Sequence, residues 1–279
     1  MGSKDIFGRF LNRQDAPYML QKNVIDKIGS IVGDRNLRLD LDRVYAFPED
    51  ASLIPRLVKS ATQNSFKVIP VGNESHIQYN KALSGFPLKI EFQGNELILS
   101  LSKMNRVKKV IPEDLYVILE PGVALKDLNK LLEPYNLFYP LATKDQRGTV
   151  GGSVGCGLKG EISSSGRKER IVHTKDFVLA LDVVTADGEL IKTGARVFKS
   201  VTGYDLPRIF TGSWGTLGII TEISLRLHPI GRKKDFDNLV ISPFEKVEIK
   251  SSKDDPKTNL NLRIKGLLDP KGVFADLNV

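Results

Sequence analysis

The sequence is poor in the residues that build disulfides and metal centres. Its 279 residues include one cysteine, Cys156, and three histidines, His76, His173 and His228. A single cysteine excludes a disulfide within the chain and any cysteine-rich iron–sulfur site. Because the histidines are scattered along the sequence, we predict no metal site. The low cysteine content fits a reducing compartment, and we expect a cytoplasmic protein.

Long apolar runs are also missing. No run approaches the ~20 residues that a helix needs to cross a bilayer, so we predict no integral membrane segment. The formal net charge of +8 comes from 41 Lys and Arg against 33 Asp and Glu. The basic groups at 103–109, 167–170 and 232–234 lack the interleaved aromatics of a nucleic-acid surface, so we expect no nucleic acid. Solvated loops account for this charge, with an acidic partner subunit or an anionic ligand as the alternative.

Glycine, by contrast, is concentrated in residues 148–160, where six of thirteen positions lack a side chain. Such a density requires either left-handed backbone or the close approach of another group, and we interpret the stretch as a loop. Gly155-x-Gly157-x-x-Gly160 matches the dinucleotide fingerprint, which must follow a buried strand and open a helix. Here a loop is expected before it, and residues 161–166 cannot start a stable helix. We therefore reject classical nicotinamide binding.

Hydrophobic periodicity predicts an α+β chain with two lobes and a tail. Helices are expected at 20–32 and from Leu53, with Pro55 in the first turn of the second. Strands at 44–47 and 67–72 flank that second helix, so the order is a βαβ unit with a small parallel sheet.

Turn signals predict further elements. Gly94-Asn95 between two alternating runs indicates a hairpin of 88–92 with 97–101, and Asp187-Gly188 indicates a second hairpin. A helix after Pro121-Gly122 is expected to bury four leucines, and a late strand is expected to point three apolar side chains inward. These residues are Leu125, Leu128, Leu131 and Leu132, and Ile223, Leu225 and Leu227. Beyond Pro229 we expect weak order until Leu260.

Three turns lined by backbone recur in this order along the chain: 70–72, the glycine stretch and 212–218. Concave arrays of backbone N–H groups bind anions, and a pyrophosphate needs several of them. A flat aromatic ring accepts close backbone approach on its face. Taken singly, each turn is explained by tight chain reversal. Their order and spacing together favour a nucleotide ligand.

Several segments resemble one known family. They are residues 97–106, 115–129, 149–152, 176–188, 194–206 with 212–222, and 262–274. The chain is similar to the FAD-linked oxidases of the vanillyl-alcohol oxidase and p-cresol methylhydroxylase type, and nearest to the FAD-binding subunit of glycolate oxidase. The likeness covers roughly residues 38 to 230 and 260 to 275.

The resemblance implies a two-lobed FAD-binding domain of the p-cresol methylhydroxylase type, with a small parallel lobe and a larger, mixed or antiparallel lobe. The expected segments are 1–36 (helical), 37–110 and 111–230 (the two lobes), and 231–279 (linker and tail). FAD is expected to bind non-covalently between the lobes. The implied cofactor-binding residues are Gly72, Asn73, Ser75, His76, Thr149, Gly151, Gly152, Gly155, Cys156, Gly157, Gly215, Thr216, Gly218, Ile219 and Ile220.

The chain also departs from the family pattern. Glu74 stands where glycine is usual, and a carboxylate beside a pyrophosphate costs free energy unless it turns to solvent. Ile171-Val172 replaces Tyr-Gly, and Lys159 replaces a small residue. For His76 the alternatives are covalent flavin attachment, hydrogen bonding and an exposed loop position. Cys156 is expected to pack beside the cofactor.

Members of the family carry a substrate-cap domain between the last flavin-binding strand and a C-terminal signature, which residues 262–274 resemble. In this chain only about thirty residues, 230–259, occupy that place. We therefore nominate no catalytic residue. The resemblance implies an FAD-binding subunit of a glycolate or D-lactate (2-hydroxy acid) dehydrogenase complex, with a larger flavoprotein subunit and an iron–sulfur subunit as partners. It leaves peripheral attachment to the inner membrane through those partners open. The alternative is a capless pseudoenzyme or assembly subunit without catalysis.

Overall fold

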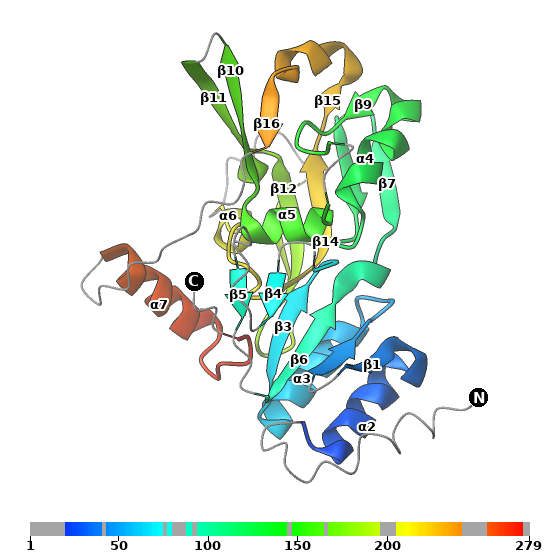
Figure 1. The fold of residues 1–279 in the computed structure, drawn as a ribbon, viewed down its shortest axis with the longest axis vertical. Coiled ribbons are helices and arrows are strands. Elements are labelled where there is room, and N and C mark those ends of the chain that lie inside the picture. Colours follow the sequence, from blue (N-terminus) through cyan, green and yellow to red (C-terminus); the bar gives the residue numbers. More distant parts are fainter. Residues whose placement is uncertain are drawn as a thin grey trace.

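The computed structural model describes residues 20–40, 43–74, 77–79, 88–90, 94–143, 147–164, 167–195, 205–241 and 256–275. Along the longest axis a four-stranded sheet with two helices lies at one end and a three-stranded sheet at the other, with a five-stranded sheet between them (Figure 1). This mixed helix and sheet architecture confirms the predicted α+β class. The four-segment division stays a prediction. Within the part of the chain that the structure describes, no helix is long and apolar enough to cross a membrane.

The four-stranded sheet is mostly parallel. Its order is β1 (Leu37–Asp40), β2 (Arg43–Ala46), β6 (Glu96–Ser100) and β3 (Lys67–Val71). The last three strands run parallel to one another, and β1 pairs antiparallel with β2. The predicted parallel sheet is thus confirmed, although β6 lies between the two strands of the βαβ unit.

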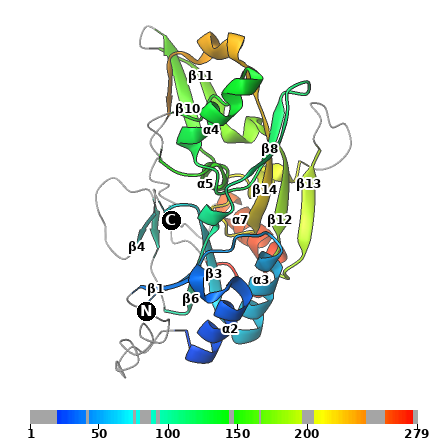
Figure 2. The same cartoon turned by 90° about the vertical axis from the view of Figure 1, so that its right-hand side faces the viewer.

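Two helices, α2 (Lys22–Val32) and α3 (Leu53–Asn64), pack side by side against this sheet (Figure 2). Both were predicted, and α2 ends at Gly33, whose φ is 85°. Pro55 lies in the first turn of α3, where its missing N–H leaves no helical hydrogen bond unmade. The helices bury Ile28, Ile54 and Leu57 completely, so burial of one apolar face holds them to the sheet.

The hairpin predicted around Gly94-Asn95 is wrong. The strand β5 (Leu88–Ile90) pairs in parallel with β4 (Ile77–Tyr79), and β6 pairs in parallel with β2 and β3. All five residues of β6 are buried, which is the pattern of a central parallel strand covered on both faces. A glycine turn signal shows that the chain reverses, and it does not identify the partner strand.

The five-stranded sheet is antiparallel. Its order is β13 (Leu190–Gly194), β12 (Val178–Val184), β14 (Ile219–Arg226), β8 (Tyr116–Leu119) and β7 (Val107–Ile111). The hairpin predicted at Asp187-Gly188 is confirmed by the β12–β13 pairing. The predicted inward side chains of β14 and the residue after it, Ile223, Leu225 and Leu227, are fully buried.

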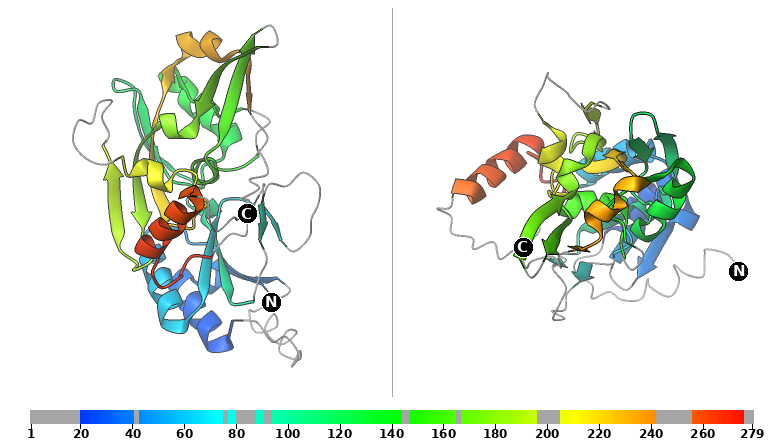
Figure 3. Two further views of the ribbon diagram at one scale, coloured as in Figure 1. Left: turned by 90° about the vertical axis from the view of Figure 1, so that its left-hand side faces the viewer. Right: turned by 90° about the horizontal axis from the view of Figure 1, so that it is seen from above.

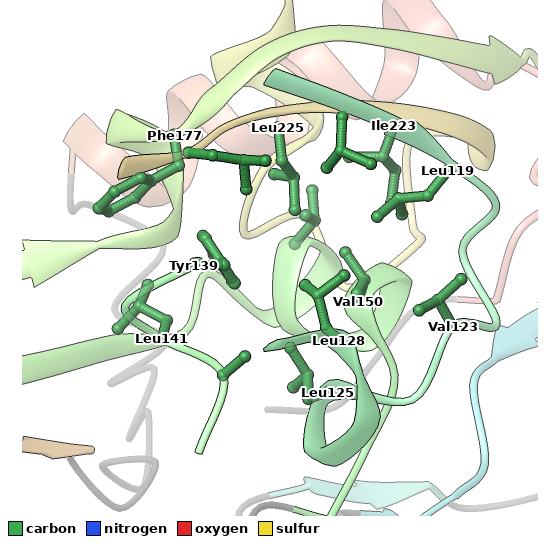
Figure 4. Close-up of a cluster of buried hydrophobic side chains, with 14 of the residues drawn as sticks. Leu119, Val123, Leu125, Leu128, Tyr139, Leu141, Val150, Phe177, Ile223 and Leu225 are labelled. Carbon is green, nitrogen blue, oxygen red and sulfur yellow. The ribbon is translucent and has the colours of Figure 1, made fainter. Parts of the chain in front are cut away.

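Two helices, α4 (Leu125–Leu132) and α5 (Val150–Cys156), cover one face of the five-stranded sheet. Leu128 of α4 and Val150 of α5 point toward Ile223 and Leu225 of β14 in one continuous core (Figure 4). The predicted burial of Leu131 is wrong, because this side chain is 47% exposed. The side of α4 that faces the core is narrower than the arc on which the four leucines lie, so one of them reaches solvent.

The three-stranded sheet at the far end has the order β11 (Arg167–His173), β10 (Lys159–Ser164) and β16 (Leu239–Ile241). The remaining short elements are β9 (Leu137–Phe138), β15 (His228–Pro229), α6 (Pro207–Phe210) and the 3-10 helices η1 (Asp34–Asn36), η2 (Leu101–Lys103), η3 (Glu133–Tyr135), η4 (Thr174–Asp176) and η5 (Ile230–Phe236). The expectation of weak order after Pro229 is wrong for 230–241, since η5 follows at once and β16 pairs with β10. Residues 242–255 lie outside the described ranges.

The helix α7 (Pro256–Leu268) projects from the side of the molecule in two views at right angles (Figures 1 and 3). The chain after it returns to β3, where Phe274 forms a parallel bridge with Val68. The final described segment therefore extends the edge of the four-stranded sheet.

Candidate cofactor-binding site

The glycine stretch is a short helix, so its interpretation as a loop is wrong. Thr149 caps the N-terminus of α5, and its Oγ1 accepts a hydrogen bond of 3.1 Å from the N–H of Gly152. Gly157 ends the helix at φ 67°, which favours glycine. Glycine has low helix propensity, so burial of Val150 and Val154 and the two caps must stabilise these seven residues. Because the strand β10 follows, the rejection of the nicotinamide fingerprint stands.

Two glycines of α5, Gly151 and Gly155, differ in the space around them. A Cβ at Gly151 would overlap the ring of Pro121, and the Gly151 N–H donates a hydrogen bond of 2.7 Å to the Pro121 carbonyl. A Cβ at Gly155 would meet nothing within 4 Å. Gly152 is exposed, and Gly155, three residues after it and four after Gly151, lies between the two around the helix. Gly151 is therefore required for packing, whereas the surface at Gly152 and Gly155 carries no side chain: a Cβ at Gly152 would lie 3.3 Å from Oγ1 of Thr149, and the space at Gly155 is open.

The turn after β3 reaches the N-terminus of α5. A Cβ at Gly72 would overlap Oγ1 of Thr149, and the Gly72 carbonyl accepts a hydrogen bond of 3.0 Å from Ser100 Oγ. Glu74 lies in the same turn in left-handed backbone, with φ 60°. Of the residues predicted for this turn, the structure brings Gly72 and Asn73 to the site. Ser75 and His76 lie outside the described residues.

The turn at 211–218 reaches the other end of α5. The N–H groups of Gly212 and Trp214 donate hydrogen bonds of 2.9 and 2.8 Å to the carbonyls of Val154 and Gly155. A Cβ at Gly215 (φ 75°) would overlap the ring of Pro70 in β3. The three predicted turns are thus close together in space.

We call this arrangement the backbone ring: it runs from Pro70 and Gly72 to Thr149, along α5 to Gly155, and through Trp214 and Gly215 back to Pro70. It contains most of the predicted residues that the structure describes. Gly218, just before β14, and Ile219 and Ile220, its first two residues, are also buried. A Cβ at Gly218 would meet Val183, so that glycine is required for packing.

Several N–H groups of the ring already have protein acceptors. The N–H groups of Val150 and Gly151 donate to the carbonyls of Val123 and Pro121, and that of Ser153 donates to Thr149. What α5 offers a ligand is therefore a surface without side chains. An anion-binding role for its N-terminal donors is not supported.

The titratable group at the end of α5 is the Cys156 thiol. Burial raises the pKa of the Cys156 thiol to about 12, and its Sγ lies 3.5 Å from the Ser153 carbonyl. This thiol stays protonated at neutral pH, which supports a packing role and not redox catalysis. No group of three or more His, Cys, Asp or Glu side chains that could hold a metal occurs in the described ranges.

His228 lies away from the ring, among the aromatic rings of Phe138, Phe177 and Phe236. Burial, together with the charges of Arg226, Arg232 and Arg170, lowers the pKa of His228 to about 4, against a weaker opposing effect of Asp235. The imidazole is therefore neutral at neutral pH.

This pKa makes the stability depend on pH. Between pH 6.5 and about 4 the unfolded chain binds a proton at His228 and the folded chain does not, so stability falls as pH falls through this window. Because the His228 side chain is half-exposed, we expect the free energy of unfolding to fall by about 1 to 2 kcal/mol across this window. We predict that His228→Phe is less destabilised than the unaltered protein when urea unfolding is compared at pH 7.5 and 4.5. Equal losses in the two proteins would contradict it.

Sequence reasoning missed two ion pairs near these turns. The buried carboxylate of Glu120, in the residue before Pro121, pairs with Arg106 at 2.7 Å. Lys265 pairs with the buried Asp269 at 2.6 Å. Lys265 and Asp269 are four residues apart, which is the spacing of an ion pair on a helix, so the sequence contains a signal for this second pair.

Known proteins match this chain over much of its length. It is 35% identical over 193 residues to the mitochondrial D-lactate dehydrogenase [cytochrome] of Arabidopsis thaliana, covering 69% of this chain and 31% of that protein. It is 31% identical over 208 residues to glycolate oxidase subunit GlcD of Bacillus subtilis (strain 168), covering 74% of this chain and 40% of that protein. The chain therefore spans two fifths or less of the length of these two relatives.

A solved structure shows the same fold. Alkyldihydroxyacetonephosphate synthase aligns with a TM-score of 0.57 and 18% identity, over 76% of this chain and 42% of that one. At that identity the likeness concerns the fold alone. The model of the FAD binding domain family matches residues 43–194, more than half of the chain. The resemblance and the predicted cofactor, FAD, are thus confirmed, and the chain belongs to the family of FAD binding domains.

Proposed function

We propose that this chain is the FAD-binding part of a flavin-dependent oxidoreductase that acts on glycolate, D-lactate or a related small 2-hydroxy acid. The observation that carries the proposal is the backbone ring, in which α5 presents Gly152 and Gly155 without side chains. The substrate class is supported by the names of two relatives, a D-lactate dehydrogenase and a glycolate oxidase subunit. When bound, FAD supplies a two-electron acceptor.

We propose that the cofactor lies against the open side of α5 and binds without a covalent bond. The turn after β3 would contact the pyrophosphate, and α5 would contact the flavin and the ribityl chain. The 215–220 segment would contact the flavin ring and the adenosine side. The proposed contacts are those predicted from the sequence: Gly72, Asn73, Ser75, His76, Thr149, Gly151, Gly152, Gly155, Cys156, Gly157, Gly215, Thr216, Gly218, Ile219 and Ile220. Gly151 and Gly218 would act through the packing that sets the ring.

Oxidation of a 2-hydroxy acid also requires a base that takes the hydroxyl proton. The side chains on the described part of the ring include Thr149, Cys156, Trp214 and Thr216, and none of these is a base at neutral pH. The carboxylate of Glu74 lies in the turn that we assign to the pyrophosphate and not in the segments that we assign to the flavin. We propose that the proton-transfer group comes from elsewhere, either from a partner or from a part of the protein beyond the described residues. A larger flavoprotein subunit and an iron–sulfur subunit are the partners that we propose, in the cytoplasm or at the inner membrane.

A second function is favoured by Glu74. This carboxylate lies in the turn proposed to hold the pyrophosphate, where two like charges repel unless the side chain turns to solvent. A subunit that keeps the fold for assembly and binds FAD weakly would tolerate it. The two functions differ in one measurable property, which is the affinity for FAD.

The test is an absorption spectrum of the purified protein before and after incubation with FAD and removal of the excess. Bound flavin is expected, and a colourless protein that takes up no FAD would refute the first function and support the second. Glycolate or D-lactate is then added without oxygen. No bleaching is expected from this chain alone, and bleaching would show that it carries its own base.

A further inference from the structure

The C-terminal segment contacts the backbone ring through one lysine, Lys265, whose side chain is 16% exposed. The ammonium group of Lys265, near the end of α7, donates hydrogen bonds of 2.7 Å to the Thr216 carbonyl and 3.0 Å to the Phe274 carbonyl. It also donates to the Asp269 carboxylate at 2.6 Å. An ammonium group has three N–H donors. Lys265 therefore connects the 211–218 turn with the residues that follow α7.

Asp269 holds the other side of this connection. Its side chain is fully buried, and its two oxygens accept hydrogen bonds from the N–H groups of Val273 and Phe274, at 2.8 and 2.9 Å. These bonds fix residues 273–275, which pair with β3. There the Val68 N–H donates a hydrogen bond to the Val273 carbonyl, and the Ala275 N–H donates one to the Val68 carbonyl. The position of the ammonium group is thus fixed relative to β3.

Other contacts place the same turn between α5 and β3. Trp214 packs against a buried cluster that includes Val71 of β3 and Ala275, and Gly215 lies against Pro70. Trp214 has φ 56° and Gly215 φ 75°, so two successive residues adopt left-handed backbone. For tryptophan this conformation is unfavourable and persists only where surrounding contacts impose it. The hydrogen bond from Lys265 to Thr216 comes two residues after Trp214.

We propose that Lys265 is a positioning residue for FAD: it holds the 211–218 turn in the conformation that closes the backbone ring, and so couples the C-terminal segment to cofactor affinity. This inference rests on the proposed function. It assigns a role to a residue outside the matched family domain, 43–194. Lys265 does not contact FAD in this proposal, and it acts through the Thr216 carbonyl.

The test compares Lys265→Met with Lys271→Met. Lys271 lies in the same segment, but its side chain is 57% exposed and pairs with an exposed Asp187 at 3.5 Å. We expect the dissociation constant of FAD to rise at least about tenfold in Lys265→Met and to stay within twofold in Lys271→Met. We also expect amide hydrogen exchange in the 211–218 turn, without FAD, to accelerate in Lys265→Met alone.

If Lys265→Met does not fold, Lys265→Gln leaves a neutral donor beside Asp269, whose two oxygens keep their hydrogen bonds from Val273 and Phe274, and removes the ammonium group that serves three acceptors. Faster exchange in the turn with lower FAD affinity supports the proposal. Unchanged exchange, or unchanged affinity in a variant with a lowered melting temperature, overturns it, because Lys265 would then only stabilise the fold. Failure of the unaltered protein to bind FAD refutes the proposed function, and this inference with it, whatever the exchange measurement shows.

Discussion

Replacing Gly151 with alanine is expected to destabilise the folded protein by about 2 to 3 kcal/mol. The new methyl group would overlap the ring of Pro121 and lie 2.8 Å from the Pro121 carbonyl oxygen. Neither group can rotate away, since the proline ring is rigid and the same carbonyl accepts the Gly151 N–H. The helix α5 would have to move off the sheet. Urea unfolding of the purified variant measures the loss, and we expect the melting temperature to fall by about 5 to 10 °C.

The matched control is Gly155→Ala, four residues along the same helix. Its methyl group would meet nothing within 4 Å, and alanine is favoured over glycine in a helix by up to about 1 kcal/mol. This control is expected to be as stable as the unaltered protein or slightly more stable. A Gly151→Ala variant with unchanged stability would show that α5 can shift without cost, and the packing argument would then fail.

The local elements of the fold could be predicted because their signals are local. The stripe of α3, the position of Pro55 and the Asp187-Gly188 turn each depend on residues close in sequence. The predicted hairpin that includes β6 is wrong because the true partners of this strand, β2 and β3, are distant in the chain. Its alternation of apolar residues suggested one exposed face, whereas both faces are buried.

The helix α5 could not be predicted from its composition. Glycines at 151, 152 and 155 argue against a helix, and only the tertiary contacts of Val150 and Val154 and the two caps make it stable. The sequence did identify the three turns of the ring. It could not show that α5 uses its N-terminal N–H groups internally, nor that Lys265 reaches Thr216 across 49 residues. Both facts depend on how distant segments meet.

Replacing Gly155 with leucine is expected to weaken FAD binding at least about 100-fold while leaving the fold intact, a loss of about 2.7 kcal/mol in binding. The side chain would project from the side of α5 that bears Gly152 and Gly155, where we propose that the cofactor lies. Because a Cβ at Gly155 would meet nothing within 4 Å, the folded protein has room for the first atom of this side chain. Flavin retention during gel filtration, followed by fluorescence titration with FAD, measures the loss, and the urea midpoint reports the fold.

The control for this prediction is Gly231→Leu in η5. A Cβ at Gly231 would also meet nothing within 4 Å, and the residue is exposed, outside the backbone ring. The variant adds the same side chain at another open position, so any general effect of an added leucine appears in both variants. We expect Gly231→Leu to bind FAD like the unaltered protein. If Gly155→Leu does so too, the open side of α5 is not the cofactor surface, and the glycines at 152 and 155 need another explanation. Loss of binding in Gly155→Leu alone, with an unchanged urea midpoint, would separate the two reasons for glycine in α5: Gly151 for the fold and Gly155 for the ligand.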